Sequence, residues 1–389
     1  MNGAARERPR RRPGRILFLS PGVNLYGAEI SLLHVVRLFS PDTWQLSFVV
    51  PESGPFEQEI RRQGWAVDFA RLPAGRGLPP LRWPATLLLA RLIRRIRPDL
   101  VHLNLHLPWP VASAASMLAG IPLVIHVRNM INLHDHGATG RFLFRRAAAY
   151  ICISEAVRDR MLASDLADGS TATRVKVIHD GRDLSPFEKG NRQRFRAELA
   201  VAPGTPVIGM VARLEPMKGQ DIFLEAARLV ARRIPEARFV LVGEVMRSGD
   251  EAYRRRLEEL AKADPLEGRV SFLGYRTDVP DILAGLDCFV HSSRRGAFVS
   301  VLIEAMAAGL PIVASEVDGI PECVGRDGQA ELVTGLEPAA FADAIVRVVT
   351  DSARTGAMVQ KARERARRLY DAEPLARATE AVFNGVLND

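Results

Sequence analysis

The stretch VIGMVARLEPMKGQDIFLEAARLVARRIPEARFVLVG (207–243) decides the fold of this chain. It opens with an apolar run of strand length, passes through a polar loop, continues as a helical pattern from near Asp221, and closes with a second apolar run at 238–243. Strands that alternate with helices of about 10–15 residues are typical of parallel βαβ units. The stretch therefore predicts a doubly wound α/β sheet.

The same alternation continues on both sides of this stretch. Strand-like runs that precede it lie at 16–20, 46–50, 100–105, 123–127, 150–154 and 175–179, and those that follow lie at 269–274, 288–292 and 311–315. A polar linker within 180–206 separates two Rossmann-type series. We expect a disordered basic tail (1–14), an N-terminal domain (15–188), a C-terminal domain (189–370) and a final helix (371–389) packed near the domain junction.

The composition is that of a soluble globular protein. Of 389 residues, 47% are hydrophobic and 25% charged, which are ordinary values. No apolar run reaches the roughly 18 residues that cross a bilayer, and we find no signal peptide. The three cysteines, Cys152, Cys288 and Cys323, are too scattered for a disulfide framework or a zinc cluster. We expect buried thiols and a cytoplasmic protein.

Basic charge gathers in the first half of the chain. Residues 1–190 hold 26 Lys/Arg against 16 Asp/Glu, whereas the remainder holds 27 against 29. The segment WPATLLLARLIRRIRP (83–98) is a candidate amphipathic helix with arginines near its end. It is either an ordinary helix whose arginines favour the C-terminal dipole, or a contact with anionic lipid at the inner face of the cell membrane. Nucleic acid is disfavoured, because no aromatic-basic platform accompanies the charge.

Two cations follow the strand at 207–211. Arg213 and Lys218 lie on the loop that connects this strand to its helix, within reach of one diphosphate. Fixed cations there would stabilise the charge of a leaving nucleotide diphosphate. The alternative is that both are solvated loop charges.

A second candidate phosphate site follows the strand at 288–292. The segment SSRRGAFVSVLIEAMAAG (292–309) is a small-residue turn that leads into a helix, so the N–H groups near Phe298, Val299 and Ser300 can face an anion. Glu304 interrupts an apolar run in that helix. We therefore expect a partner for its carboxylate, and ribose hydroxyls are candidates.

The N-terminal half offers weaker signals. Gly27 lies in the turn after the first strand, where glycine permits close approach of a ligand. His126 lies near the end of the strand LVIHV (123–127), where it is either a residue of the site or a packed histidine. A pyridine-nucleotide dehydrogenase is disfavoured, since neither half opens with a GxGxxG turn.

Several of these segments in this order resemble glycosyltransferase family 4, the retaining GT-B enzymes. The likeness runs from about Arg15 to Val346 and is densest in GMVARLEPMKGQDIFLEAA, RVSFLGYRTDVPDILAGLDCFVHSS and VLIEAMAAGLPIVASEVDGIPECV. It implies two Rossmann-like domains that face each other across a cleft. It also implies transfer of a hexose from a nucleotide-diphosphate sugar to a glycan or lipid-linked acceptor, in cell-surface polysaccharide or glycolipid biosynthesis.

The resemblance assigns roles residue by residue. Arg213 and Lys218 match the pair that contacts the donor diphosphate, and Gly27 matches the loop that faces the distal phosphate. His126 matches the histidine near the transferred sugar, and Glu304 matches the second Glu of the Glu-x7-Glu motif, which binds ribose. The backbone around Gly274–Arg276, with Tyr275 in its middle, would lie against the nucleobase. No metal and no cofactor are implied, because the departing phosphate takes the acceptor proton.

One departure concerns the sugar end of the expected site. The first Glu of Glu-x7-Glu falls at Gly296, and Arg294 and Arg295 beside it reverse the local charge. The enzyme is active with a carboxylate from elsewhere or without one, or it is weakened, or it is a nucleotide-sugar-binding relative without turnover. The sequence leaves these three accounts open.

Overall fold

The computed structural model describes residues 12–73, 83–105, 108–129, 137–246 and 250–388, so most of the expected tail lies outside the described residues. Internal contacts divide the chain into two units. The first unit extends to Gly181 and also contains the segment from Ala372 onward, whereas the second unit is Arg182–Asp371. The division thus falls earlier than the expected boundary after residue 188, and the final helix belongs to the first unit.

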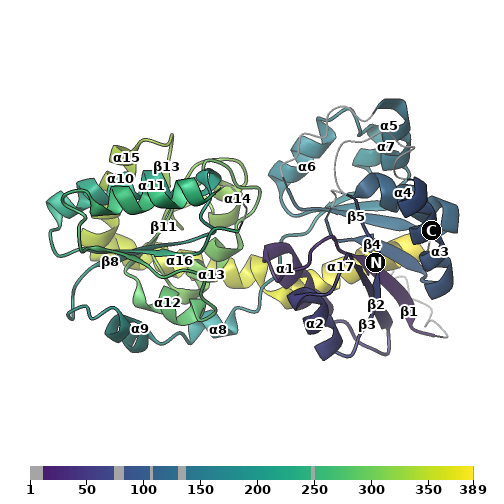
Figure 1. Cartoon of the computed structure of the whole chain (residues 1–389), viewed down its shortest axis with the longest axis horizontal. Helices are drawn as coiled ribbons and strands as arrows, with labels where there is room; N and C mark the ends of the chain where they lie inside the picture. The colour runs from purple at the N-terminus through teal and green to yellow at the C-terminus, as the bar shows by residue number, and fades with distance from the viewer. Residues whose placement is uncertain (1–11, 74–82, 106–107, 130–136, 247–249, 389) are drawn as a thin grey trace, which may run out of the picture. The chain divides into compact units, whose positions relative to one another are not determined.

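The first unit contains a parallel sheet in the order β3-β2-β1-β4-β5-β6-β7 (Figure 1). Its strands are β1 (Gly14–Leu19), β2 (Trp44–Val50), β3 (Ala66–Phe69), β4 (Leu100–Leu103), β5 (Leu123–Val127), β6 (Ala149–Cys152) and β7 (Val175–Val177). Its helices are α1 (Gly27–Val36), α2 (Pro55–Arg62), α3 (Trp83–Ile96), α4 (Trp109–Ala119), α5 (Gly137–Arg145), α6 (Glu155–Leu162), α7 (Gly169–Ala172) and α17 (Ala372–Asn388).

Helix α17 completes the core of this first unit although it comes last in the chain. It packs on α1, and its Phe383 is fully buried. The ring of Phe383 lies 6.3 Å from that of Phe18 in β1 and 6.1 Å from those of Phe39 and Trp44. The far end of the chain therefore supplies part of the core that covers the first strands.

The second unit contains a parallel sheet in the order β10-β9-β8-β11-β12-β13 (Figure 1). Its strands are β8 (Val207–Val211), β9 (Arg238–Val242), β10 (Val270–Phe272), β11 (Cys288–His291), β12 (Ile312–Ser315) and β13 (Glu331–Val333). Its helices are α8 (Ser185–Glu188), α9 (Arg192–Glu198), the 3₁₀ turn η2 (Pro216–Lys218), α10 (Gln220–Arg233), α11 (Glu251–Lys262), α12 (Val279–Gly285), α13 (Ser300–Ala308), α14 (Ile320–Val324), α15 (Pro338–Thr350) and α16 (Ser352–Tyr370).

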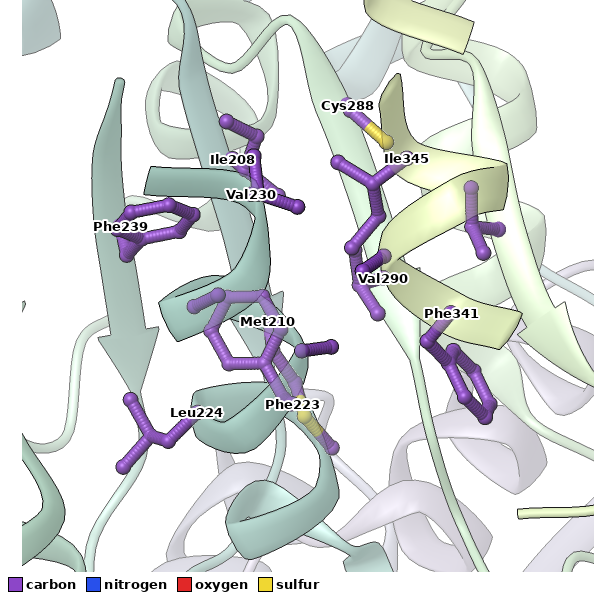
Figure 2. Packing of buried hydrophobic residues seen from close by; sticks show 14 of the residues in the cluster. Ile208, Met210, Phe223, Leu224, Val230, Phe239, Cys288, Val290, Phe341 and Ile345 are labelled. Atoms are coloured by element: carbon purple, nitrogen blue, oxygen red, sulfur yellow. The ribbon is translucent and has the colours of Figure 1, made fainter. Parts of the chain in front are cut away.

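Helices cover both faces of this second sheet, so its strands are apolar on both sides. On one face, Ile208 of β8 and Val290 of β11 pack with Phe223 of α10 and Ile345 of α15, as Figure 2 shows. On the opposite face, Val207 packs with residues of α12 and α13. Burial of each large apolar side chain contributes about 1.5–3 kcal/mol, and the sheet is thus a firm base for the loops at its edge.

The predicted parallel α/β architecture is confirmed, and the predicted strands coincide with observed ones to within a few residues. The two strands that the sequence pattern missed, β3 and β13, are both edge strands. They are short and mostly half-exposed, so neither forms an apolar run. The three cysteines are free and buried, as expected.

The topology fixes where each unit can bind a ligand. In the second unit the chain leaves β8 toward β9 on one side and returns to β11 on the other. In the first unit the corresponding change of direction lies between β1 and β4. Open parallel sheets bind ligands at such switch points, beyond the carboxyl ends of the strands.

Candidate functional site

The loop after β8 lies directly against the loop after β11. Gly219 has a left-handed φ of 72°, and a Cβ on it would lie 2.0 Å from the carbonyl oxygen of Ser292. The Ser292 hydroxyl donates to the Gly219 carbonyl oxygen over 2.8 Å. Only glycine fits this close approach, and the approach brings both predicted phosphate-binding loops of the second unit to one place.

Arg213 and Lys218 both lie on the first of these loops, and Lys218 ends the turn η2. Arg213 contacts Glu215 over 3.0 Å, and its side chain stays 41% exposed. Burial lowers the pKa of Lys218, Glu215 opposes this effect, and Arg213 adds to it. Among the described residues Lys218 has no salt bridge, so the loop holds positive charge that its own carboxylates do not fully neutralise.

Helix α13 presents its N-terminus at the same sheet edge. Its N-cap is Val299, whose apolar side chain makes no capping bond to the first turn. The Phe298 ring packs on Tyr370 at 5.4 Å, and Val299 is buried. Both side chains are apolar, so any contact of this turn with an anion would have to come from its backbone.

Glu304 has the partner that its apolar surroundings predicted. Its carboxylate lies 2.9 Å from the guanidinium of Arg182, and the two side chains are only 11% and 7% exposed. The Arg182 Nε is buried without a hydrogen-bond partner among the described residues. The sequence interpretation did not identify Arg182. The signal that could have found it is the need of a buried carboxylate for a nearby cation.

The charge around Gly296 differs from the sequence expectation. Arg294 forms two 2.8 Å bonds to Asp221, and Arg295 lies 3.5 Å from Asp318. The predicted reversal of local charge is therefore wrong, because a carboxylate faces each arginine. Nothing in the spacing of residues 292–309 could have indicated these distant partners.

Asp318 places a carboxylate beside Gly296. Its Oδ2 accepts a 3.1 Å bond from the Gly296 amide, and the Gly319 amide donates in return to the Gly296 carbonyl oxygen over 2.9 Å. Asp318 has a φ of 47°, a left-handed conformation that Asp tolerates better than most residues. A side chain at Gly296 would be tight, since its Cβ would lie 3.1 Å from Val299.

Tyr275 lies beyond β10 at the same edge of the sheet. A Cβ at Gly243 would lie 1.9 Å from the Ala212 carbonyl oxygen, and the Gly243 amide donates to Gly274 over 2.8 Å. The loops after β8, β9 and β10 are thus in contact with one another. The Tyr275 residue is 65% exposed, which leaves it free to cover a planar ligand.

In the first unit, Gly27 is the first residue of α1. Gly22, earlier in the same turn, also lies close to a neighbour, since a Cβ on it would lie 2.1 Å from the carboxylate of Glu29. Glu29 is buried, and burial raises its pKa while nearby Arg128 opposes the rise. The sequence interpretation gave Glu29 no role.

His126 lies near the carboxyl end of β5 and is 7% exposed. Its Nδ1 lies 3.3 Å from Arg128 Nη2, and Arg128 is also paired with Asp180. Burial holds the pKa of His126 well below its ordinary value, and Arg128 and His102 add to this effect. His126 is thus buried and hydrogen-bonded, in a cluster that the sequence pattern did not reveal.

Two kinds of feature are absent from the described residues. They include no group of three or more His, Cys, Asp or Glu side chains able to hold a metal ion. No helix among them is long and apolar enough to cross a membrane.

Both units match known family models. Residues 191–367 match the model of "Glycosyl transferases group 1", and residues 26–181 match that of the "Glycosyl transferase 4-like domain". The D-inositol 3-phosphate glycosyltransferase of Nocardia farcinica is 32% identical over 208 residues, which are 50% of this chain and 46% of that protein. The enzyme of the same name from Mycobacterium tuberculosis is 36% identical over 180 residues, 46% of this chain and 36% of its own length. The chain thus spans less than half the length of these relatives.

Solved structures extend the likeness over nearly the whole chain. Anabaena HepE in complex with UDP and glucose superposes with a TM-score of 0.81 at 25% identity, covering 95% of this chain and 99% of HepE. The sucrose-phosphate synthase of Thermosynechococcus elongatus superposes with a TM-score of 0.74 at 19% identity, covering 96% and 99%. The second match concerns the fold alone.

Proposed function

The chain belongs to the group 1 glycosyltransferases of family 4 and has their GT-B fold, and from this premise we propose that it transfers a hexose from a nucleotide-diphosphate sugar to an acceptor hydroxyl. Transfer would retain the anomeric configuration and need no metal. The observation that carries the proposal is the position of Arg213 and Lys218 at the switch point between β8 and β11, beside the N-terminus of α13.

The chemistry follows from where negative charge develops. When the bond from the sugar to the diphosphate breaks, the leaving oxygen gains charge. We propose that Arg213, Lys218 and the first-turn amides of α13, which lie at the carboxyl edge of one sheet, are the donors that stabilise that charge. A phosphate oxygen of the leaving group then accepts the proton of the acceptor hydroxyl.

For the donor we propose a uridine-diphosphate hexose. The support is the likeness to Anabaena HepE, which has also been crystallised with UDP-glucose. Glu304 is suited to accept hydrogen bonds from the two ribose hydroxyls, and the Arg182 guanidinium lies 2.9 Å from its carboxylate. Tyr275 is exposed enough to cover the base.

Asp318 favours an active enzyme over a binding protein without turnover. It supplies a carboxylate within one hydrogen bond of Gly296, where the family's first Glu is missing. We propose that Asp318 accepts hydrogen bonds from the hexose in place of that Glu. A nucleotide-sugar-binding relative remains the second candidate function, because Arg295 also contacts this carboxylate.

A panel of nucleotide sugars tests the proposal. The wild-type chain should hydrolyse or transfer from at least one donor. Arg213→Ala and Lys218→Ala should each lower kcat/KM by about 10²–10³ through loss of leaving-group stabilisation. Arg233→Ala removes a salt bridge with the half-exposed Asp343 and is the matched control. Near-normal kcat/KM in both loop variants contradicts the assignment.

Two variants separate the enzyme from the binding protein. Asp318→Asn should lower transfer by about tenfold to a hundredfold, below the loss typical of a full transition-state contact, and leave the affinity for UDP unchanged. If the wild-type chain binds nucleotide tightly without turnover, and Gly296→Glu creates activity, the second candidate function is correct.

We propose a lipid-linked acceptor, and the support is one exposed surface of the first unit. Helix α3 and strand β3 expose Phe69 at 49%, Trp83 at 51% and Leu88 at 61%, and a groove of about 610 Å³ between them is lined in part by Arg71 and Arg91. Among the described residues neither arginine has a salt bridge. We propose that this surface holds the protein on the anionic inner face of the cell membrane, at about 1 kcal/mol per arginine.

Co-sedimentation with vesicles tests this surface. Binding should increase with the phosphatidylglycerol content of phosphatidylcholine vesicles, and both Arg91→Glu and Leu88→Ser should weaken it. Arg233→Ala again serves as the control. Binding that does not respond to anionic lipid leaves the α3 arginines with an ordinary role at a helix C-terminus.

A further inference from the structure

The loop between β8 and α10 carries a carboxylate between its two cations. Glu215 lies two residues after Arg213 and three before Lys218, and its side chain is only 12% exposed. One of its oxygens lies 3.0 Å from Arg213 Nη2. Because like charges repel, a carboxylate in this loop weakens the binding of a diphosphate and thus opposes the two cations beside it.

The turn that contains Glu215 does not depend on its carboxylate. Glu215 is the N-cap of η2, and its side chain makes no capping bond. The turn is held by backbone groups instead, since the Lys218 amide donates to the Glu215 carbonyl oxygen over 2.9 Å. Arg294 adds bonds from its guanidinium to the Pro216 carbonyl oxygen over 2.6 Å and from its amide to that of Met217 over 2.9 Å. All of these contacts remain when an amide replaces the carboxylate.

The contact between Arg213 and Glu215 can be exchanged for another. It uses one terminal nitrogen of the guanidinium, and among the described residues Arg213 has no other salt bridge. Gln220 Nε2 donates to the Arg213 carbonyl oxygen over 2.6 Å, so the backbone of Arg213 is held independently of Glu215. A rotation of the side chain alone can therefore move the guanidinium from the carboxylate to a phosphate oxygen.

Glu215 also acts on the second cation of the loop. Burial lowers the pKa of Lys218, and the negative charge of Glu215 opposes this effect. Glu215 thus stabilises both positive charges before a diphosphate binds, and it competes with the diphosphate for them afterwards.

The reaction changes the charge that this carboxylate meets. In the donor, the outer phosphate is esterified to the sugar. When the bond between the anomeric carbon and the phosphate oxygen breaks, the acceptor oxygen forms the new bond to that carbon, and the phosphate oxygen takes the acceptor proton. A terminal phosphate loses this proton to water near about pH 6, so the product carries more negative charge at pH 7 than the donor. The repulsion by Glu215 is therefore stronger in the product complex.

We propose that Glu215 competes with the terminal phosphate of the nucleoside diphosphate product for Arg213 and so speeds release of the product. This role rests on the proposed function, in which the loop binds the diphosphate of the donor. Product release limits turnover in many enzymes. A charge that weakens the product complex more than the donor complex therefore favours turnover.

Glu215→Gln in the full-length chain tests this role, because it removes the charge and keeps the size of the side chain. Calorimetric titration should show that the variant binds UDP about tenfold more tightly than wild type. Its affinity for uridine, which has no phosphate, should not change. In stopped-flow displacement of a fluorescent derivative of UDP, the dissociation rate should fall by a similar factor. Unchanged or weaker binding of UDP overturns the proposal, since Glu215 would then support Arg213 rather than compete for it.

Steady-state kinetics separate the product from the donor. In Glu215→Gln the inhibition constant of UDP should fall about tenfold, whereas KM for the donor should fall by no more than about threefold. Equal changes in the two constants overturn the preference for the product. Glu316→Gln is the matched control, because Glu316 follows β12 at the same edge of the sheet and contacts Arg326. This control should leave both constants unchanged.

A double-mutant cycle tests whether the competition is for Arg213. In an Arg213→Ala background, Glu215→Gln should raise the affinity for UDP by less than about threefold, because the contested cation is gone. A full tenfold gain in that background shows that Glu215 does not compete for Arg213 and overturns the proposal.

The same titrations distinguish failure of this proposal from failure of the proposed function. If neither wild type nor Glu215→Gln binds UDP, the assignment of a donor site to this loop is wrong, and the role of Glu215 falls with it. If wild type binds UDP and Arg213→Ala weakens the binding, while Glu215→Gln does not strengthen it, the donor site stands and only the role of Glu215 is overturned.

Discussion

The carboxyl edges of the two sheets differ in how their charges are balanced. In the second unit Arg213 and Arg295 keep side chains 41% and 49% exposed. In the first unit His126 and Arg128 are 7% and 5% exposed, and they bond to one another and to Asp180. One edge thus holds charge available to a ligand. The other has used its charge internally and offers neutral donors in fixed positions. A low local dielectric makes such a closed cluster rigid, and costly to break.

The largest difference between the two edges is expected in the stability of Arg128 variants. Arg128→Met leaves Asp180 buried and unpaired, so the free energy of unfolding should fall by about 3–5 kcal/mol. The matched change in the second unit, Arg294→Met, should cost about 1 kcal/mol, because the Arg294 side chain is 33% exposed and Arg256 remains 3.9 Å from the Asp221 carboxylate.

Urea unfolding followed by circular dichroism measures both changes, and hydrogen exchange assigns each loss to a unit. Equal losses in the two variants, or loss of protection in the second unit on changing Arg128, would show that the two edges are not balanced differently.

The second prediction concerns the buried pair in the otherwise open edge. Glu304→Gln should lose about 1.5–3 kcal/mol of UDP binding, since a hydrogen bond to a charged group is worth that much. Calorimetric titration should show that the preference for UDP over its 2′-deoxy form falls by about tenfold or more. Arg182→Met should also reduce the preference for UDP over its 2′-deoxy form.

Glu316→Gln is the matched control for this pair, because Glu316 is a more exposed carboxylate that contacts Arg326 at the surface. If the preference for UDP over its 2′-deoxy form is unchanged in both the Glu304 and Arg182 variants, this pair does not bind ribose.

The third and smallest effect is a dependence of folding stability on pH, which we expect in both units. Burial lowers the pKa of His102 to about 3 in the first unit and that of His291 to about 3 in the second. The unfolded chain therefore binds more protons than the folded one between about pH 6.5 and pH 3. The stability that these two groups contribute is complete above about pH 6.5. It decreases as the pH falls from there toward 3, by up to about 1.4 kcal/mol per pH unit for each histidine.

Urea unfolding of His102→Leu between pH 7 and pH 5 should show a shallower dependence of stability on pH than wild type. The same slope in both proteins would mean that His102 is charged or exposed in the folded state.

The sequence predicts a structural feature well when the residues that form it lie close together in the chain, and poorly when they lie far apart. The strands, their parallel arrangement and the loop of Arg213 and Lys218 follow from patterns within some forty residues. The need of Glu304 for a partner was also predictable, because a carboxylate in an apolar helix cannot remain alone. Its partner was not, since Arg182 lies far away in the sequence.

The same holds for the other residues that the pattern missed. Asp318 meets Gly296 from the loop after a neighbouring strand. Asp180, which follows β7, meets Arg128, which follows β5, past the one strand between them. Each contact depends on strand order and on which loops share an edge. A spacing argument within one segment does not contain that information.

Helix α17 has a consequence for the order of biosynthesis. The first unit needs Phe383 against Phe18, Phe39 and Trp44 to close its core, so its early strands must wait on the ribosome for a helix made some two hundred residues after the rest of that unit. The second unit is complete once Asp371 has emerged. Domains usually mature in the order of their synthesis, and in this chain the later domain should be the first to reach its final stability.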